Sequence, residues 1–406
     1  MPMPFVDFIL QHEADDPVRL LLSREKYPGI DLDLAVTTLE VRRKLKSKVP
    51  EWYAVPSLVY PSRLSGEQCS SSETARYKAA VALSHAGRSG KAVRVADLTG
   101  GMGVDSWAFA QVAGEVLYNE MQEGLAQATE LNFRELGVEN VRFSCKKVEM
   151  GTMEEILDGF EPDVIFLDPA RRAEDGRKVF LIEECQPDVL GLLPELFAAS
   201  RYVLLKLSPM ADITMACKRL GEHVRDVHVV AAGGECKELL FLLDREWEGT
   251  CSMFVVEDGA VMEIPGLARN DVEYGIPSIG DVLFEPGKAQ AKAGAFALPC
   301  RYGLTKLGVH THLYTGEAVP EGLEPFGKWF EVVEVLPLNN RTMKEAGKRW
   351  PQAEVTARNV PMTSDLLRKK LGCASGGDIH LFGVRVDAAS GAGNYLIVTK
   401  KRYGTD

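Results

Sequence analysis

Three acidic residues, each at the end of a short apolar run, are the positions of this 406-residue chain best placed for chemistry. Asp97 ends the first run and precedes a glycine-rich turn, Glu120 ends the second and Asp168 ends the third. A further run carries Lys206 near its end. Because the carboxyl ends of parallel strands meet at one edge of a sheet, we expect these four side chains to gather at one rim.

The turn after Asp97 lets a ligand approach the backbone closely, because glycine has no Cβ and tolerates unusual dihedral angles. A G-x-G-x-x-G turn would hold a pyrophosphate at the following helix N-terminus, but here Gly101-x-Gly103 is followed by Ser106. The carboxylate of Asp97 would also repel a pyrophosphate. It suits a ligand with a positive end, such as the methionyl ammonium of S-adenosylmethionine. The alternatives are a tight turn without a ligand and a helix-capping role for Asp97.

The other two acids have distinct roles open to them. Glu120 is placed to accept both hydroxyls of a ribose, as an acid at the second strand does in nucleotide-binding folds. Asp168 is followed by Pro169, which removes an N–H and fixes the chain as it leaves the sheet. Asp168 could orient or deprotonate a substrate nitrogen or oxygen within hydrogen-bond reach, or it could only lock the Pro169 turn.

The elements that must position these residues alternate apolar runs with helical segments, which predicts a parallel sheet with helices on both faces. The last two strands leave no room for a crossover helix and are expected to form an antiparallel pair, which a pure Rossmann dehydrogenase would not have. The expected strands are 93–98, 115–120, 141–145, 163–168, 202–207, 228–232 and 239–244.

Together these features make residues 92–246 resemble a class I S-adenosylmethionine-dependent methyltransferase domain, an α/β fold with a Rossmann-like seven-stranded core. The matching residues are Asp97 to Gly103 for the glycine motif, Glu120 for the ribose acid and 168–171 for the motif after the fourth strand. The segment 233–243 resembles the turn into the family's last strand. The wider chain, with 68–76 before the core, resembles bacterial methyltransferases that carry a THUMP-like C-terminal domain and are taken to act on RNA.

The resemblance implies S-adenosyl-L-methionine as the cofactor and predicts its site. In this family the stretch before the first core strand often lies over the cofactor, so 70–77 is expected near it. Glu149 is assigned in place of the family's adenine-contacting acid, which is missing after the third strand, where the chain reads Cys145-Lys146-Lys147-Val148. Cofactor contacts are expected from Asp97, Thr99, Gly100, Gly101, Gly103, Asp105, Glu120, Glu149 and Asp168, and catalysis from Asp168, Pro169, Arg171 and Lys206.

The residues near Asp168 narrow the reaction that the resemblance implies. Amino-group methyltransferases often have a second proline and an aromatic residue where this chain has Ala170-Arg171. Uridine C5-methyltransferases share the Asp-Pro-x-Arg pattern but need a cysteine after the fifth strand, where this chain has Ser208, and serine does not easily replace a thiolate. Covalent carbon methylation is therefore disfavoured, while methylation of a nitrogen or a ribose oxygen stays open.

Basic side chains beside this motif have two interpretations each. Arg171 and Arg172 could hold a substrate phosphate or carboxylate with their guanidinium groups, or pair with Glu174 or Asp175. Lys206 could polarise a ribose hydroxyl or a base carbonyl, or pair with Asp168 as part of the structure.

The net charge of −11 speaks against nucleic-acid binding by the whole surface, but the charge is uneven. Between Arg341 and Lys370 eight basic residues stand against three acidic ones, a balance of +5, with Trp350 among them. This region is either an RNA-docking patch with an aromatic residue for base stacking or a solvated helix face. The substrate contacts predicted for the patch are Lys348, Arg349, Arg368 and Lys369.

The favoured reading is thus a methyltransferase acting on a nitrogen or ribose oxygen of tRNA or rRNA. A small-molecule or protein methyltransferase is one alternative, and a cofactor-binding but non-catalytic RNA-binding protein is another. Four domains are expected: a helical domain over 1–90, the methyltransferase domain over 91–248, a small α+β ferredoxin-like module over 249–323 and a THUMP-like α+β module over 324–406.

Other features fit a cytoplasmic enzyme without a metal or a membrane anchor, and they leave the oligomeric state open. No stretch approaches the roughly 20 apolar residues of a membrane span, and the N-terminus lacks the pattern of a signal peptide. The eight cysteines form no C-x-x-C pair, and His310-Thr311-His312 has no nearby ligands at metal-site spacing. Locally, helices are expected over 32–48, 71–85 and 364–372, an irregular linker over 50–61, and a β-rich segment over 289–314.

Overall fold

The computed structural model describes residues 3–86, 92–171, 181–264 and 272–402. The chain forms two compact units. The first contains Met1–Val227 and Glu238–Cys251, and the second contains His228–Lys237 and Ser252–Asp406.

The central sheet confirms the predicted α/β fold. β1 pairs in parallel with β2 and with β4, β2 pairs in parallel with β3, and β4 with β7, whereas β9 runs antiparallel to β7. The sheet order is β11-β10-β8-β9-β7-β4-β1-β2-β3. All seven predicted strands are present, and β10 and β11 are two further strands that the sequence analysis did not anticipate. The strands are β1 (Arg94–Asp97), β2 (Glu115–Asn119), β3 (Val141–Ser144), β4 (Val164–Leu167), β7 (Tyr202–Leu207), β8 (Val224–Ala232), β9 (Glu235–Asp244), β10 (Ser252–Glu257) and β11 (Ala260–Ile264).

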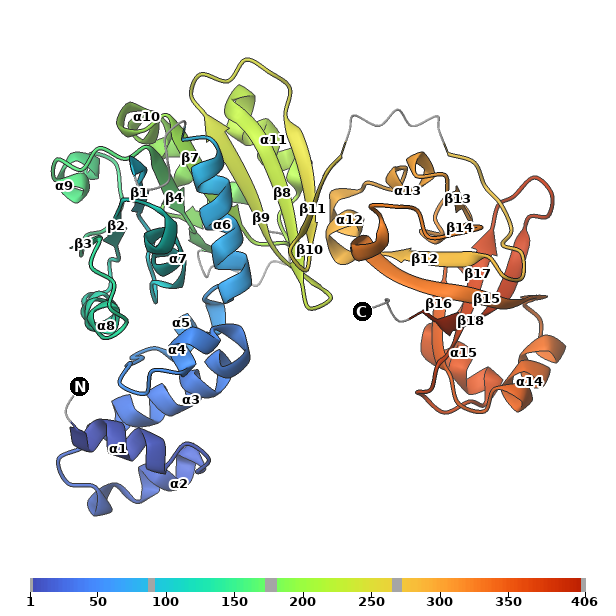
Figure 1. Ribbon diagram of the computed structural model, residues 1–406, viewed down its shortest axis with the longest axis horizontal. Coiled ribbons are helices and arrows are strands. Elements are labelled where there is room, and N and C mark those ends of the chain that lie inside the picture. The colour runs from blue at the N-terminus through green and yellow to red at the C-terminus, as the bar shows by residue number, and fades with distance from the viewer. Residues whose placement is uncertain (1–2, 87–91, 172–180, 265–271, 403–406) are drawn as a thin grey trace. The chain divides into compact units, whose positions relative to one another are not determined.

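The strand order reverses between β1 and β4, and this reversal places the site. Right-handed crossovers put α7 and α8 on one face of the sheet and α9 and α10 on the other, so the connections diverge beyond the carboxyl ends of β1 and β4. Open α/β sheets bind ligands in such a crevice. The helices are α7 (Val104–Val112), α8 (Glu123–Glu135), α9 (Met153–Leu157), α10 (Val189–Ala199) and α11 (Ile213–Leu220) (Figure 1). A pair of two-residue strands, β5 (Ala170–Arg171) and β6 (Cys185–Gln186), follows β4.

The region before β1 is helical, as predicted. α3 has the predicted bounds, and α6 begins at a capping box in which the Ser71 and Thr74 side chains each bond the other's backbone N–H. The expected linker after residue 50 is wrong in part, because Pro50 occupies the first position of a short helix, where its missing N–H costs nothing. The helices are α1 (Met3–Gln11), α2 (Pro17–Leu22), α3 (Leu32–Lys48), α4 (Pro50–Tyr53), α5 (Arg63–Gln68) and α6 (Ser72–Ser84).

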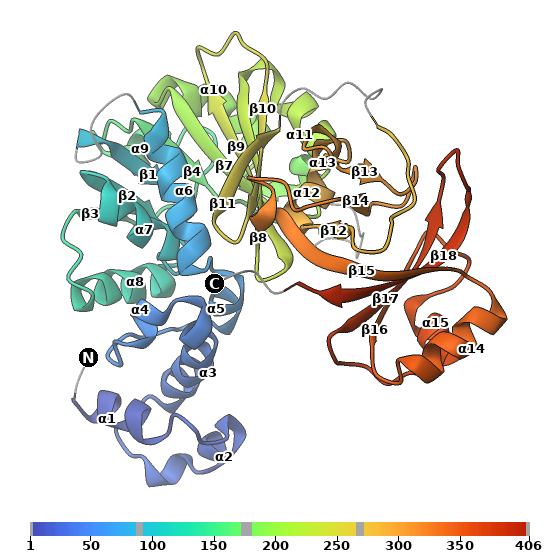
Figure 2. The same cartoon turned by 45° about the vertical axis from the view of Figure 1, so that its right-hand side comes forward.

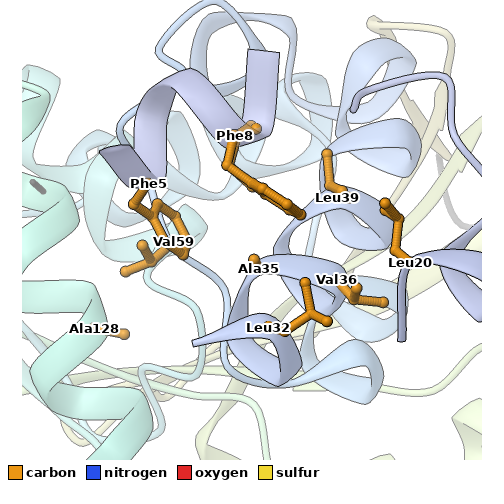
Figure 3. Packing of buried hydrophobic residues seen from close by; sticks show 10 residues of the cluster. Phe5, Phe8, Leu20, Leu32, Ala35, Val36, Leu39, Val59 and Ala128 are labelled. Atoms are coloured by element: carbon orange, nitrogen blue, oxygen red, sulfur yellow. The ribbon is translucent and has the colours of Figure 1, made fainter. Parts of the chain in front are cut away.

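Apolar side chains attach these helices to the domain of the central sheet. Phe5 and Phe8 of α1 pack with α3 (Figure 3). The same cluster includes Val59, which lies between α4 and α5, and Ala128 of α8. The backbone of Val59 also exchanges two hydrogen bonds with the buried Asn132 side chain of α8, at 2.9 and 2.8 Å. The helical region therefore shares a core with the sheet domain, and α6 lies along α7 (Figure 2).

The second unit is built on a seven-stranded sheet of order β13-β14-β12-β15-β18-β17-β16. This sheet joins strands from both predicted C-terminal modules, since β12 pairs with β15. The expected β-rich character of 289–314 is wrong in part, because α12 and α13 lie there. The elements are β12 (Val282–Pro286), α12 (Lys288–Ala293), α13 (Leu298–Arg301), β13 (Thr305–Lys306), β14 (Tyr314–Gly316), β15 (Gly327–Pro337), α14 (Asn340–Arg349), β16 (Glu354–Arg358), α15 (Ser364–Leu371), β17 (Ile379–Val386) and β18 (Gly393–Lys401).

The described part of the chain contains no helix that is both long and apolar enough to span a membrane. It also contains no group of three or more side chains suited to hold a metal ion. His312, of the His310-Thr311-His312 segment, stacks on Phe296 with ring centroids 3.6 Å apart.

Candidate cofactor and active site

A cavity lies beyond the carboxyl ends of β1, β2 and β4, where the sequence analysis expected a site. Seven of the predicted residues line it: Thr99, Gly100, Gly101, Gly103, Asp105, Glu120 and Asp168. The segment before the first core strand also contributes, through Ser65, Gln68, Cys69 and Ser70. Of the expected stretch 70–77, Ser70 is the residue that reaches the lining.

Packing within the protein requires glycine at two positions of the glycine-rich turn. A Cβ on Gly100 would lie 2.2 Å from the Tyr118 ring, and one on Gly103 would lie 2.6 Å from the Thr129 side chain. Gly103 also has a φ of +87° at the start of α7, a conformation that L-residues rarely adopt. The turn therefore sits directly against β2 and α8, which fixes its backbone at the cavity.

Asp97 is fully buried, and it is not among the described lining residues of the cavity. Its carboxyl group accepts hydrogen bonds from the Ser106 hydroxyl at 2.5 Å and from the Thr99 N–H at 3.1 Å. Burial raises the pKa of Asp97 to about 8, with the Asp105 charge adding to the effect and the Ser106 hydrogen bond opposing it. In this structure Asp97 therefore ties the turn to α7, and its predicted contact with an ammonium stays a prediction.

Glu120 lies at the tip of β2 with its carboxylate held by two backbone groups. One oxygen accepts the Gly101 N–H at 3.0 Å and the other accepts the Gln122 N–H at 2.8 Å. The side chain is buried but lines the cavity. Since a carboxylate has about four acceptor positions, two lone pairs stay available for ribose hydroxyls.

Glu149 lies away from the cavity lining as described, on the surface in a 2.6 Å ion pair with Lys147. The cavity wall after β3 is instead formed by Lys146, Lys147 and Val148. Asn119, which the sequence analysis did not single out, holds this wall. Its amide donates to the Lys146 carbonyl at 2.9 Å and to the Leu98 carbonyl at 3.1 Å, and its side-chain oxygen accepts the Lys146 N–H at 3.1 Å.

Asp168 is held from two directions at the edge of the cavity. Its backbone N–H donates to the Thr99 hydroxyl at 2.6 Å, and one carboxylate oxygen lies 2.5 Å from Lys206 Nζ. The Asp168 side chain is 35% exposed and that of Lys206 only 13%. Of the two roles considered for Lys206, the structure shows the pair with Asp168, and the lysine stands behind the lining residues.

The charge state of Lys206 follows from its neighbours. Burial by itself would lower the pKa of Lys206, but the carboxylates of Asp168, Glu238 and Asp105 outweigh burial and raise the pKa above its usual value. Lys206 is therefore a fixed cation at physiological pH and not a proton acceptor.

The structure describes the remaining predicted residues of this motif only in part. Pro169, the residue after Asp168, is buried, and Ala170 lines the cavity. The backbone of Arg171 pairs with Cys185 in the β5–β6 ladder. The Arg171 side chain and the whole of Arg172 lie outside the described residues.

A buried ion network, which the sequence analysis missed, supports the cavity from below. Lys78 of α6 is fully buried, and its Nζ lies 2.8 Å from both carboxylate oxygens of Glu238 and 3.2 Å from Asp105. The Ser70 hydroxyl accepts from Lys78 at 2.9 Å and donates to Asp105 at 2.9 Å. The available signal was a single lysine among the buried residues Ala75, Ala79 and Ala82 of one helix.

The predicted substrate patch lies on α14 and α15 of the second unit. The two helices meet where Gly347 allows close approach, since a Cβ there would lie 1.6 Å from the Leu371 carbonyl oxygen. Both helices end in basic residues near this contact, which their macrodipoles favour.

Ion pairs and a ring contact engage part of this patch. Arg349 pairs with Glu334 at 2.8 Å and lies over the ring of Trp350, which packs against the domain core, and Arg368 pairs with Asp365 at 3.7 Å. The lysines that are exposed and make no ion pair with any described residue are Lys344, Lys348, Lys369 and Lys370.

Comparisons with known proteins agree with this architecture. Family models match residues 327–401 as a THUMP domain-like domain and residues 283–322 as a ferredoxin-like domain. The crystal structure of a candidate methyltransferase from Porphyromonas gingivalis W83 is 31% identical, with a TM-score of 0.82 and 98% coverage of both chains. An rRNA methylase from Streptococcus thermophilus matches 42% of this chain and 94% of its own at 14% identity, with a TM-score of 0.30. No curated protein sequence matches the chain.

Proposed function

We propose that this chain, which belongs to the class I methyltransferases with an N-terminal helical region and a THUMP-like C-terminal domain, transfers the methyl group of S-adenosyl-L-methionine to a nitrogen of tRNA or rRNA. The observation that carries the proposal is the placement of Asp168: its carboxylate lines the cavity and pairs with Lys206, while its backbone N–H donates to the Thr99 hydroxyl.

The donor set of the cavity fits this cofactor. Three carboxylates, those of Glu120, Asp105 and Asp168, line it and suit a ligand with two cationic groups and a ribose. Apolar side chains such as Leu98, Met121 and Leu125 and the wall at 146–148 supply surface for a flat base. When bound, S-adenosyl-L-methionine supplies a methyl group already activated on a sulfonium, so that in-line placement of the acceptor provides much of the rate.

Asp168 is the residue that acts on the acceptor. Its carboxylate accepts a hydrogen bond from the target N–H and takes the proton as the nitrogen gains the methyl group. Lys206 pairs with that carboxylate and fixes its orientation. Its charge and its place behind the lining make Lys206 a positioning residue and not a general base.

Nitrogen is favoured over a ribose oxygen as the methyl acceptor, because the carboxylate of Asp168 is paired with the fixed cation Lys206. A ribose hydroxyl is a weak acid and needs a base stronger than a carboxylate whose partner is a fixed cation. An amino or ring N–H of a nucleobase needs only orientation and removal of a proton after methyl transfer. The site around Asp168 supplies both.

RNA as the substrate is supported by the four exposed lysines of α14 and α15 that pair with no described residue and by the THUMP domain-like match over 327–401. The net charge of −11 favours a second candidate, a small-molecule or protein methyltransferase. We also propose the four-part domain division at 90, 248 and 323 and action in the cytoplasm.

Methyl transfer from tritiated S-adenosyl-L-methionine tests the proposal. Total RNA and total protein from a strain lacking the gene serve as separate acceptors. Label in RNA is expected, and Asp168→Asn should reduce it by about 100-fold or more while cofactor binding is retained. Label in protein alone would replace the RNA proposal, and cofactor binding without label in RNA or protein would favour a small-molecule acceptor or a binding role.

A further inference from the structure

Five ionisable groups in and behind the cavity wall form a cluster of two contacting sets. Lys206 Nζ contacts Asp168 at 2.5 Å, and Lys78 Nζ contacts both oxygens of Glu238 at 2.8 Å and Asp105 at 3.2 Å. Asp105 and Asp168 line the cavity. The other three stand behind it, and Lys78 and Glu238 are 0% and 3% exposed.

Strand register brings the two halves of this cluster together. Lys206 of β7 lies opposite Leu240 of β9 in the antiparallel ladder. Glu238, two residues before Leu240, is therefore the diagonal neighbour of Lys206 on the same face, within reach of a long side chain. Lys206 thus stands between Asp168 on one side and Glu238 on the other.

Because of its position, the positive charge of Lys206 acts on both the Asp168 and the Glu238 carboxylates. In a poorly solvated cluster the attraction between unit charges is several-fold stronger than in water, and salt screens it much less than it screens exposed pairs. The Glu238 carboxylate is attracted to the same ammonium group as the Asp168 carboxylate. The charge of Lys78 in turn neutralises that of Glu238.

We propose that Glu238 and Lys78 are positioning residues that set, through Lys206, how strongly the Asp168 carboxylate accepts a proton from the substrate. This inference rests on the proposed function, because it assigns Asp168 the role of proton acceptor. It adds two residues from α6 and β9 to the machinery of the transfer step.

The proposal predicts the direction in which the pH–rate profile moves when these charges are removed. Removing the negative charge of Glu238 leaves the whole field of Lys206 on Asp168, which favours the ionised carboxylate and weakens it as a base. The acid limb of the pH–rate profile then moves to lower pH. Removing Lys78 in the same variant restores the net charge of the cluster, so the acid limb should return to its wild-type pH.

The other titratable groups that face this cluster are Asp97 and Cys185 near Asp168, and Cys69 near Lys206 and Asp105. These three residues are the same in the wild type and in every variant of the test, so they cannot cause a difference in pH dependence between those proteins. Burial raises the pKa of the Cys185 and Cys69 thiols.

The test is the pH dependence of methyl transfer into total RNA from tritiated S-adenosyl-L-methionine, measured with the full chain. Glu238→Gln should move the acid limb down by about one pH unit and lower the plateau several-fold. Glu238→Gln combined with Lys78→Met should bring the limb back to its wild-type position. Glu235→Gln, which removes an exposed charge from the same strand, should leave the profile unchanged.

Lys78→Met alone is not used, because it would leave a buried carboxylate without its partner. Coinciding acid limbs for wild type and Glu238→Gln would overturn the proposal. A double variant that stays as shifted as Glu238→Gln would also overturn it, since the effect would then be structural. Absence of transfer by the wild-type protein would instead show that the proposed function has failed, and the inference would fail with it.

Discussion

Asn119 and Lys146 are joined by a pair of hydrogen bonds, with the asparagine oxygen accepting the Lys146 N–H at 3.1 Å and the amide donating to the Lys146 carbonyl at 2.9 Å. The fully buried side chain thereby pins the chain after β3 to the end of β2. The wall at 146–148 depends on this link, because Glu149, the residue predicted to contact adenine, turns outward to Lys147.

Asn119→Leu should therefore weaken cofactor binding without removing any side chain that lines the cavity. The change leaves the Lys146 N–H and two carbonyls without a partner, which costs about 1–3 kcal/mol for a buried group. We expect the Kd for S-adenosyl-L-methionine, measured by titration calorimetry, to rise by about tenfold or more. Glu149→Gln is the matched control and should leave the Kd within experimental scatter, whereas a weakened Glu149→Gln would restore that residue to the adenine site.

Burial of Asp97 makes the stability of the first unit depend on pH. Its pKa of about 8 in the folded protein lies above the ordinary value of 3.8, so the folded state holds a proton that the unfolded state loses. The contribution to the free energy of unfolding is complete below about pH 4 and is lost as pH rises toward 8, at up to about 1.4 kcal/mol per pH unit.

Asp97→Asn cannot ionise, so urea unfolding between about pH 5 and pH 8 should show a shallower fall in stability for the variant than for the wild type. The comparison uses the slope with pH and not the absolute stability, because the substitution also alters the 2.5 Å contact with Ser106. Parallel curves for the two proteins would show that Asp97 is already ionised in the folded state.

Local sequence patterns predicted most of the sheet and the rim because each depends on neighbours in the chain. Glu120 and Asp168 follow apolar runs directly, and the turn at 100–103 is contiguous, so their place needed no knowledge of tertiary contacts. The Lys78–Glu238 pair joins residues 160 positions apart, and no periodicity reports such a contact. The role of Asn119 could not be predicted for another reason. A single polar residue at a strand end is common, and the hydrogen-bond partners of Asn119 lie on other segments of the chain.

Gly347 sets the distance between α14 and α15, and Gly347→Ala should separate them. A Cβ at this position would lie 1.6 Å from the Leu371 carbonyl oxygen, and backbone cannot yield as a flexible side chain would. We expect a loss of about 1–3 kcal/mol or more in the stability of the second unit, seen as a lower Tm. Gly124→Ala is the control, because that helical position has nothing within 4 Å of the new methyl group and alanine favours a helix. Equal Tm values for Gly347→Ala and the wild type would mean that the two helices can part without cost.

The exposed lysines of α14 and α15 give the RNA proposal its most direct test. Lys348 and Lys369 lie on different helices and pair with no described residue, so their reversal should affect nothing but the surface charge. If each contacts one phosphate of a single strand, Lys348→Glu with Lys369→Glu should reduce the slope of log Kd for total tRNA against log salt by about 1.4. The double change Arg19→Glu with Lys26→Glu, on the N-terminal helices, alters the net charge by the same amount and should leave most of the slope in place. Equal losses in the two double variants would assign RNA attraction to overall charge, and an unchanged slope in both would remove α14 and α15 from the substrate site.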